Sequence, residues 1–328
     1  MTTSDYLEQL QQDKQDLVDN LTTQGITGLT GDETFTELVP EVLNIEAGGG
    51  GASEYFEEYI DYGSSSTAGW IKTMKKLPAF KVPLNLTSLS YAYYGNSYVE
   101  EVDFSKLETS NIQDFSYSFS SMTKLNKLDL RNLDTTNAQN MAYMFTGTGQ
   151  STTSFQFLVG NKFNTSNVTN MSYMFNNLGA VGFLLDLTQI PNFNTSNVTN
   201  MEGMFGRIKT DTVILGSNFD TRKVTTMRNM FAYGYANLKY LDLSMCYTPV
   251  LTTTQQMFNN CKSLTRIDMR NFNFSSVTNY TNMFGSSASN GVPDNCLIIV
   301  ADDTQKTWIT SKFSRLTNVK TVAEYEAE

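Results

Sequence analysis

The sequence predicts an α/β repeat fold, a leucine-rich-repeat-like solenoid of about seven to eight coils of 26–30 residues. The first observation is that seven related segments each end in phenylalanine, at steps of 26, 30, 30, 26, 27 and 26 residues. The second is an apolar alternation before each segment, of the form L-x-x-L-x-L, which is typical of a leucine-rich-repeat strand. The third is length: one such unit cannot bury its own apolar face, so neighbouring units must stack into a single core. The seven terminal phenylalanines are Phe119, Phe145, Phe175, Phe205, Phe231, Phe258 and Phe284.

Each repeat has two parts. Leu125, Leu128 and Leu130 illustrate the first part, in which alternate side chains of an extended strand point to one face. The second part runs from a T-S-N turn to a Met-Phe pair, and the spacing of its apolar residues predicts a short helix or 3₁₀ turn. Asn170 is a candidate cap for that turn, as are Asn140 and Asn200. We therefore expect the terminal phenylalanines to lie one above another, with the two longer steps accommodated by loops at 147–160 and 179–191.

The cysteines of the repeats indicate core packing, and the aspartates indicate repeat architecture, rather than catalysis or metal binding. The chain has no histidine, which removes the commonest general base and metal ligand. Its three cysteines, Cys246, Cys261 and Cys296, fall at repeat or strand positions and are expected to be reduced core thiols. Aspartates occur singly at a repeating position instead of as a catalytic pair. We expect no enzymatic activity, no cofactor and no bound metal.

The N-terminal residues 1–47 form an acidic arm that is predicted to be helical. Residues 1–60 carry 13 acidic side chains and one lysine, which leaves a net charge of +2 for the other 268 residues. A helix as short as this is marginal alone, so its apolar stripe should pack against a partner. That partner is either another chain, through oligomerisation or docking into a larger assembly, or a second helix of the same arm. The stripe consists of Leu7, Leu10, Leu17, Val18 and Leu21.

The remaining boundaries follow from composition. Residues 48–53 are a glycine-rich linker, and residues 54–85 are a lead-in that covers the first edge of the solenoid. The solenoid itself spans 86–290. Residues 291–328 are predicted to form a small βαβ-like cap, in which Asp303 caps a helix that buries Trp308, Ile309 and Phe313.

Charge and hydropathy exclude several classes of partner. A net charge of −10 argues against nucleic acid binding, which needs a basic patch. No run of 18 apolar residues predicts a membrane-spanning helix, and the first residues do not have the pattern of a secretory signal. We therefore expect neither membrane insertion nor export by a signal peptide.

Three tyrosines form the candidate ligand surface. Tyr117, Tyr143 and Tyr173 each lie two residues before the terminal phenylalanine of their repeat. Stacked coils would place them in a row. The row is either an exposed aromatic stripe for sugars or protein, or a half-buried line of packing side chains.

The repeat L-x-x-L-D-L-x-x-F-[DN]-T-S-N-V-T-N-M-x-x-M-F resembles the BspA-like leucine-rich repeats of bacterial surface proteins, including mycoplasmal ones. Leu125–Phe145, Phe163–Phe175, Phe193–Phe205, Leu238–Phe258 and Leu264–Phe284 match it best. The resemblance implies an extracellular binding scaffold rather than an enzyme, and carries no fixed set of binding residues.

The flanks, Thr3–Ile45 and the segment from Cys296, resemble modules of bacteriophage virion proteins. Together the resemblances imply a surface-projecting fibre or adhesin, assembled in the host cytoplasm and displayed on the virion. The arm would bind other virion proteins, form a homo-oligomer, or both, and the solenoid would bind a host surface glycan or protein. The alternative is a BspA-like adhesin on a bacterial cell surface.

Overall fold

A computed structural model describes residues 76–77, 87–96, 101–103, 109–234 and 237–328. The chain divides into two compact units, Met1–Ile60 and Asp61–Glu328, and every described residue belongs to the second. The predicted arm, its apolar stripe from Leu7 to Leu21, the glycine-rich linker and all of the lead-in but Lys76–Leu77 therefore lie outside the described residues. Backbone alone is described for 76–77 and 101–103.

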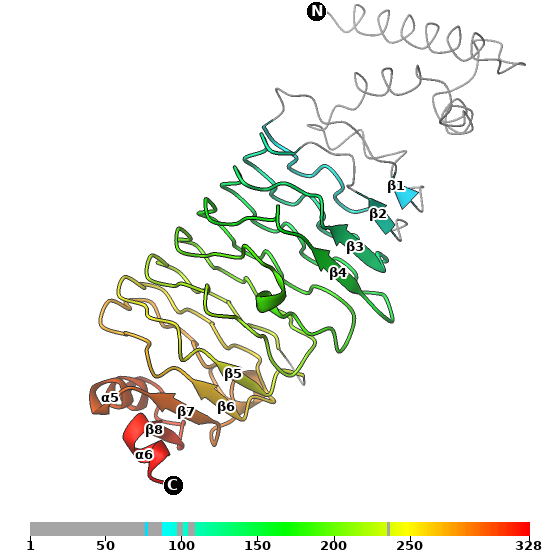
Figure 1. Cartoon of the computed structure of the whole chain (residues 1–328). Coiled ribbons are helices and arrows are strands. Elements are labelled where there is room, and N and C mark those ends of the chain that lie inside the picture. Colours follow the sequence, from blue (N-terminus) through cyan, green and yellow to red (C-terminus); the bar gives the residue numbers. More distant parts are fainter. Residues whose placement is uncertain (1–75, 78–86, 97–100, 104–108, 235–236) are drawn as a thin grey trace, which may run out of the picture. The chain divides into compact units, whose positions relative to one another are not determined.

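The second unit is a parallel β-solenoid of about six turns with few helices. Its strands lie on one side of the coils in two four-stranded parallel sheets (Figure 1). The solenoid prediction is thus confirmed, while the number of seven to eight coils stays a prediction. The first sheet consists of β1 (Lys76–Leu77), β2 (Glu101–Asp103), β3 (Lys127–Leu130) and β4 (Gln156–Val159). The second consists of β5 (Tyr240–Asp242), β6 (Arg266–Asp268), β7 (Leu297–Val300) and β8 (Val319–Thr321).

The register of the strands follows the repeat. Leu128 of β3 pairs with Val102 of β2 and with Phe157 of β4, so equivalent residues lie side by side. Between β4 and β5 the coils continue without named strands: Asp186 and Ile214 form an isolated parallel bridge, and a 3₁₀ helix, η1, spans Leu187–Gln189. The interruption includes the second of the two longer repeats, whereas the first, between Phe145 and Phe175, contains β4.

The second part of each described repeat is a series of turns; of the two predicted alternatives, a short helix or a 3₁₀ turn, the helix is absent from the described repeats. The N–H groups of Met141, Tyr143 and Phe145 donate to carbonyls of the next coil, at 3.0, 2.8 and 3.0 Å. An α-helix would direct these donors to carbonyls four residues back in the same coil. The N–H groups of Met144 and Thr146 bond three residues back, which closes the turns locally. The requirement for hydrogen bonds between coils therefore outweighs the helical spacing of the apolar residues.

The predicted asparagine caps are confirmed. Asn140, Asn170 and Asn200 each accept a hydrogen bond from the backbone N–H two residues later, at 3.1, 3.1 and 2.9 Å. These side chains also lie at parallel bridges that join successive coils. A short amide side chain thus starts the turn and satisfies one of its backbone donors.

The terminal phenylalanines form a continuous spine, as predicted. All seven are buried, and consecutive ring centroids from Phe119 to Phe284 are 5.4–6.0 Å apart with nearly parallel planes. In three repeats the leading phenylalanine packs beside the spine: Phe163 lies 6.3 Å from Phe145, Phe193 lies 6.2 Å from Phe175, and Phe219 lies 6.0 Å from Phe205. The core is therefore one column shared by all coils rather than a set of separate clusters.

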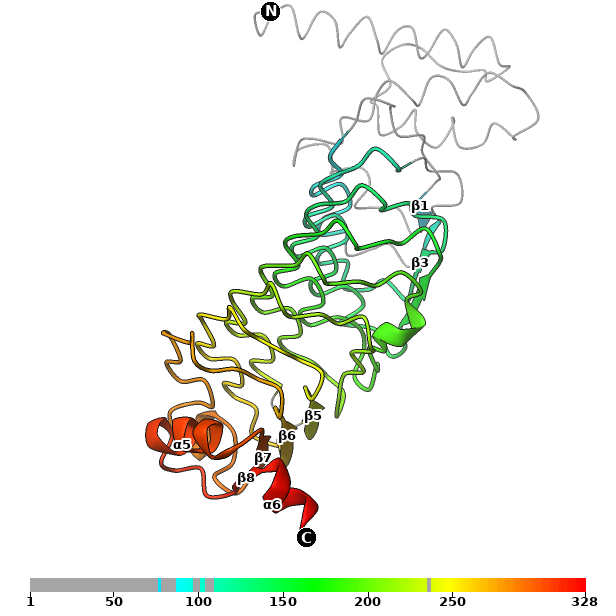
Figure 2. The ribbon, with the colours of Figure 1, turned by 60° about the vertical axis from the view of Figure 1, so that its left-hand side comes forward.

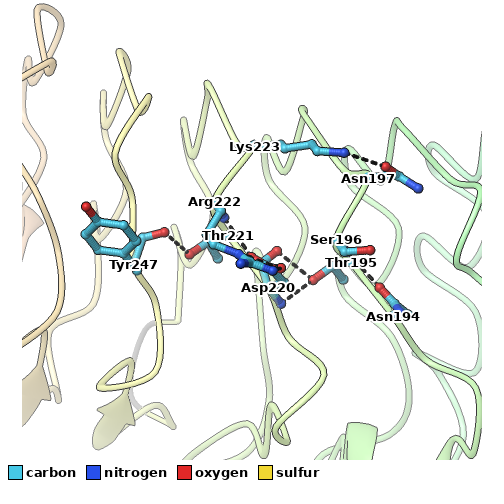
Figure 3. A network of polar contacts seen from close by, with 9 residues as sticks. All are labelled: Asn194, Thr195, Ser196, Asn197, Asp220, Thr221, Arg222, Lys223 and Tyr247. Carbon is cyan, nitrogen blue, oxygen red and sulfur yellow. Dashed lines mark hydrogen bonds and ion pairs between the residues drawn. The ribbon is translucent and has the colours of Figure 1, made fainter.

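A column of buried threonines ties each coil to the next. The Thr195 hydroxyl donates to the carbonyl of Asp220 at 2.8 Å and accepts from the Asp220 N–H at 2.7 Å (Figure 3). Thr221 donates in the same way to the carbonyl of Tyr247. These hydroxyls replace a strand ladder where the chain turns, so the buried backbone groups stay paired. The column contains Thr109, Thr135, Thr165, Thr195, Thr221 and Thr248.

The C-terminal segment forms a strand, a helix and a strand, followed by a second helix. Helix α5 (Asp303–Lys312) lies between β7 and β8 in the sequence, and α6 (Val322–Glu326) follows β8 (Figure 2). The cap of α5 is Asp302, whose side chain accepts from the Gln305 N–H, and not Asp303 as predicted. The prediction was displaced by one residue because either aspartate can cap a helix.

Helix α5 buries only part of the predicted apolar set. Ile309 is fully buried, whereas Trp308 and Phe313 are half-buried. Trp308 stacks on Phe274 of the last repeat at 4.4 Å. A second 3₁₀ helix, η2, spans Ala288–Asn290. Across the described residues, no helix has the length and apolar character needed to cross a bilayer.

Candidate functional site

The three predicted tyrosines occupy a left-handed corner that recurs in eight successive repeats of the described residues. Their φ angles are 56–59°, a region that residues other than glycine seldom adopt. The corner turns the chain so that the N–H of Tyr143 reaches the Ser172 carbonyl of the next coil at 2.8 Å. Backbone bonding between coils therefore fixes this conformation, whichever side chain is present. The corner row consists of Tyr91, Tyr117, Tyr143, Tyr173, Gly203, Asn229, Gln256 and Asn282.

The first four residues of the corner row form a tyrosine ladder. The ring centroids of Tyr91 and Tyr117 are 4.4 Å apart, those of Tyr117 and Tyr143 also 4.4 Å, and those of Tyr143 and Tyr173 4.6 Å. Adjacent planes differ by 6–11°. Tyr94 packs its ring at an angle to the first two, at 5.4 and 6.3 Å. The structure thus brings all three predicted residues together in one stack.

The ladder is half-buried, and burial affects its ionisation. Tyr117, Tyr143 and Tyr173 are partly exposed, whereas Tyr91, the first residue of the ladder, exposes 46% of its surface. Burial, followed by the neighbouring phenols, raises the pKa of Tyr117 to about 12. Burial likewise raises the pKa of Tyr143 and of Tyr173. The phenols of Tyr117, Tyr143 and Tyr173 therefore stay neutral at physiological pH.

The ladder ends at Gly203. The Tyr173 hydroxyl donates to the Glu202 carboxylate at 3.0 Å, and Arg228 lies 3.6 Å from the same oxygen. The Tyr173 ring covers Gly203 so closely that an added Cβ would lie 2.3 Å from ring carbon Cε1. Only glycine fits beneath the last ring, so Gly203 and the Glu202–Arg228 pair close the stack.

This geometry limits what the ladder can bind. A sugar stacks on the open face of an aromatic ring, but the faces within the ladder cover one another. Ring edges and hydroxyl groups are what the partly exposed middle rings offer to a ligand. Of the two arrangements left open by the sequence, the structure has the half-buried stacked row. The role of Tyr117, Tyr143 and Tyr173 as a ligand surface stays a prediction.

The three cysteines and the repeated aspartates that the sequence analysis named have structural roles, in core packing and in local ion pairs. Cys246, Cys261 and Cys296 are free and buried, and burial raises the pKa of each thiol to about 12. Asp129 and Asp268 each bind arginine side chains, at 2.6 and 2.8 Å. Among the described residues, no group of three or more acidic, cysteine or histidine side chains has the arrangement of a metal site.

Two features of the site are not predicted by the sequence analysis. Tyr91 belongs to a degenerate repeat, and the signal that marks it is its position two residues before Tyr93, which stacks on Phe119 at 5.3 Å as a terminal phenylalanine would. Glu202 and Gly203 take the place of the pair that ends in tyrosine in the preceding repeats, such as Ala142-Tyr143 and Ser172-Tyr173. That substitution, visible as M-E-G-M-F beside M-S-Y-M-F, marks the end of the ladder.

Coils of this length, stacked in parallel around one column of phenylalanines, define a repeat protein of the parallel β-solenoid class. A family model described as "Mycoplasma protein of unknown function, DUF285" matches residues 87–189 and 184–294. These matches cover more than half of the chain, and the chain belongs to this family, which is related to the BspA-like surface repeat proteins. No curated protein and no solved structure matches the chain.

Proposed function

We propose that this protein is a non-enzymatic recognition scaffold, a bacteriophage fibre or adhesin that binds the surface of the host cell. The observation that carries the proposal is the construction of the coils. One phenylalanine spine and one threonine column hold every coil to its neighbours, which leaves the outer positions free to vary without loss of the fold. Such a scaffold presents side chains at fixed spacing, which suits recognition.

The acidic arm supplies the second part of the proposal. Residues 1–60 concentrate the negative charge of the chain, and the apolar positions from Leu7 to Leu21 need a partner. In this proposal the arm oligomerises or binds other virion proteins, and the glycine-rich residues 48–53 connect it to the solenoid. The resemblance of the flanks to virion proteins favours a particle over a cell surface.

Deletion of residues 1–53 tests the division of labour. The truncated protein should remain soluble and folded, should bind host cells in a pull-down, and should fail to join particles. A pull-down with the full chain is the control for binding, and circular dichroism of the truncated protein is the control for folding. Particles that still contain the truncated protein would contradict docking through the arm.

A second candidate is a bacterial cell-surface adhesin, and membership of a family of Mycoplasma proteins favours it. The two candidates differ in where the protein is found. Immunogold labelling of purified particles is expected under the first proposal, whereas labelling of uninfected cells that release no particles is expected under the second. Failure of the full chain to bind any host cell would contradict both.

A further inference from the structure

A cavity of about 430 Å³ lies between the last repeat and the loop that follows helix α5. Its size falls within the range of about 300–1,000 Å³ that is common for small-ligand sites. It is lined by Tyr280, Thr281, Asn282, Gly285, Ser286, Lys312, Phe313, Ser314 and Arg315. Asn282 is the final residue of the corner row, so the cavity is at the opposite end of that row from Tyr91.

One wall of the cavity is held in place by Arg315. Its guanidinium donates to the Val292 carbonyl at 2.7 Å, to the Phe284 carbonyl at 2.6 Å and to the Asp294 carboxylate at 2.7 Å. These bonds satisfy the arginine and join the loop after α5 to the last coil. The loop that lines the cavity is therefore held in place without a ligand, and binding would not have to order this loop.

The polar side chains that line the cavity are open to solvent. Thr281, Asn282 and Ser314 are exposed, and their side chains have no hydrogen-bond partner within the described part of the chain. The neighbouring coil differs, because the Gln255 amide oxygen accepts from Asn279 at 3.2 Å. Hydroxyl and amide groups that the fold does not use are the groups that bind the hydroxyls of a sugar.

The cavity also carries an unneutralised positive charge. The Lys312 ammonium lies 5.0 Å from the ring centroid of Tyr280 and 5.5 Å from that of Trp308. Throughout the described ranges no carboxylate lies within ion-pair distance of it, whereas Arg315 is paired with Asp294. The two aromatic rings position the ammonium, and an anionic group of a ligand would complete its coordination.

We propose that this cavity binds an anionic sugar residue, with Lys312 pairing its charged group while Thr281, Asn282 and Ser314 bind its hydroxyls. The inference deepens the proposed function and rests on it, because it names the class of ligand on the host surface. The anion is either the carboxylate of an acidic sugar or the phosphate of a phosphorylated one. Both present one negative group beside several hydroxyls, which is the chemistry that the cavity offers.

Calorimetric titration of the full chain with glucuronate, glucose 6-phosphate and glucose tests the proposal. We expect at least one anionic sugar to bind at least about tenfold more tightly than glucose, and the stronger of the two identifies the anion. Lys312→Gln should weaken that binding by about tenfold or more. Lys262→Gln, at an exposed lysine outside the cavity, is the matched control and should leave affinity unchanged.

Trp308 gives a second, independent readout. The chain has two tryptophans, so Trp70→Phe leaves Trp308 as the sole indole. A ligand that pairs with Lys312 should change Trp308 emission in this variant, and saturation should follow the calorimetric affinity. No change in emission together with intact calorimetric binding would place the ligand elsewhere and overturn the proposal.

The proposal is also overturned if glucose binds as tightly as both anionic sugars, if neither anionic sugar binds, or if Lys312→Gln binds as well as the wild type. These failures are distinct from failure of the proposed function. A Lys312→Gln protein that still binds host cells as the wild type does would leave the scaffold function intact. If the protein binds the sugar but binds no host cell, the cavity proposal is supported and the proposed function is contradicted.

Discussion

The two halves of the corner row use one backbone conformation for two kinds of surface. From Tyr91 to Tyr173 the left-handed corner carries aromatic rings that stack on each other. From Gly203 to Asn282 the same corner carries glycine or an amide, with φ again between 53° and 61°. Figure 2 follows the coils that carry both halves, from the end that holds β1 to the end that holds α5.

The difference between the two halves shows that the coil requires the left-handed backbone at the corner but permits different side chains there. The corner conformation is needed for hydrogen bonds to the next coil, as for Tyr143 and for Gln256, which donates to the Thr281 carbonyl at 3.0 Å. The side chain at the corner is not fixed by this bond. The rings of the stacked tyrosines cover one another, whereas the amide half ends at a cavity lined by exposed polar groups. We therefore expect the first half to contribute stability and the second half to contribute recognition.

The largest effect should come from the spine, which both halves share. Phe175 is buried between Phe145 and Phe205, so Phe175→Ala should lower the free energy of unfolding by about 3–5 kcal/mol. Urea denaturation measures the loss. Tyr240→Ala, at a side chain that is 46% exposed, is the control and should change stability by about 0.5 kcal/mol or less. Equal losses would show that the spine is not the common core.

The boundary between the two halves should be the next most sensitive point. Gly203→Ala adds a Cβ 2.3 Å from the Tyr173 ring and places alanine at a φ of 61°. The conformation alone costs about 1 kcal/mol, and displacement of Tyr173 should bring the loss to about 2–3 kcal/mol. Gly182→Ala measures the conformational cost alone, because Gly182 has a φ of 84° and nothing within 4 Å of an added Cβ. Similar losses for both variants would contradict the close fit beneath Tyr173.

The sequence predicts the apolar architecture well because period and burial are linked directly. Phe119 to Phe284 recur at almost constant steps, and only a stacked column buries all of them. Asn170 was identifiable as a cap because a short amide side chain can accept from the N–H two residues later. The residue before a threonine of the column is usually Asp or Asn, as at Asn194 and Asp220, and accepts a bond from the N–H two residues later. Tyr247 stands at this position before Thr248, where the residue two places later is Pro249, which has no N–H to donate.

The features that the sequence does not predict depend on contacts between coils. Val168, Met171 and Phe175 have helical spacing, yet backbone bonds to the next coil give turns instead. The left-handed φ of Tyr143 has no signal in a single repeat, because tyrosine does not favour it. The cavity near Lys312 combines residues 280–286 with residues 312–315, and no local pattern relates the two segments.

Substitution within the corner row compares the two halves directly. Tyr143 stacks on both Tyr117 and Tyr173, and aromatic pairs contribute about 0.5–1.5 kcal/mol each. Tyr143→Ala should therefore lose about 2 kcal/mol in urea denaturation, with the corner conformation still occupied by a residue other than glycine. Gln256→Ala removes an amide from the same corner and should lose about 0.5 kcal/mol or less. If the two losses are equal, the ladder adds no stability of its own.

The smallest effect at neutral pH should come from Tyr117→Phe, and it should become visible only in alkali. The folded pKa of Tyr117 is raised to about 12, while an unfolded tyrosine has a pKa of about 10. Between these values the unfolded chain binds fewer protons than the folded chain, so stability falls as the pH rises, and below about pH 10 the contribution of this phenol is fully present. Phenylalanine keeps the stack but cannot ionise. The urea midpoint of Tyr117→Phe should therefore match the wild type at pH 8 and fall less between pH 10 and pH 12. A parallel decline of both proteins over that interval would show that ionisation of this tyrosine does not limit the ladder.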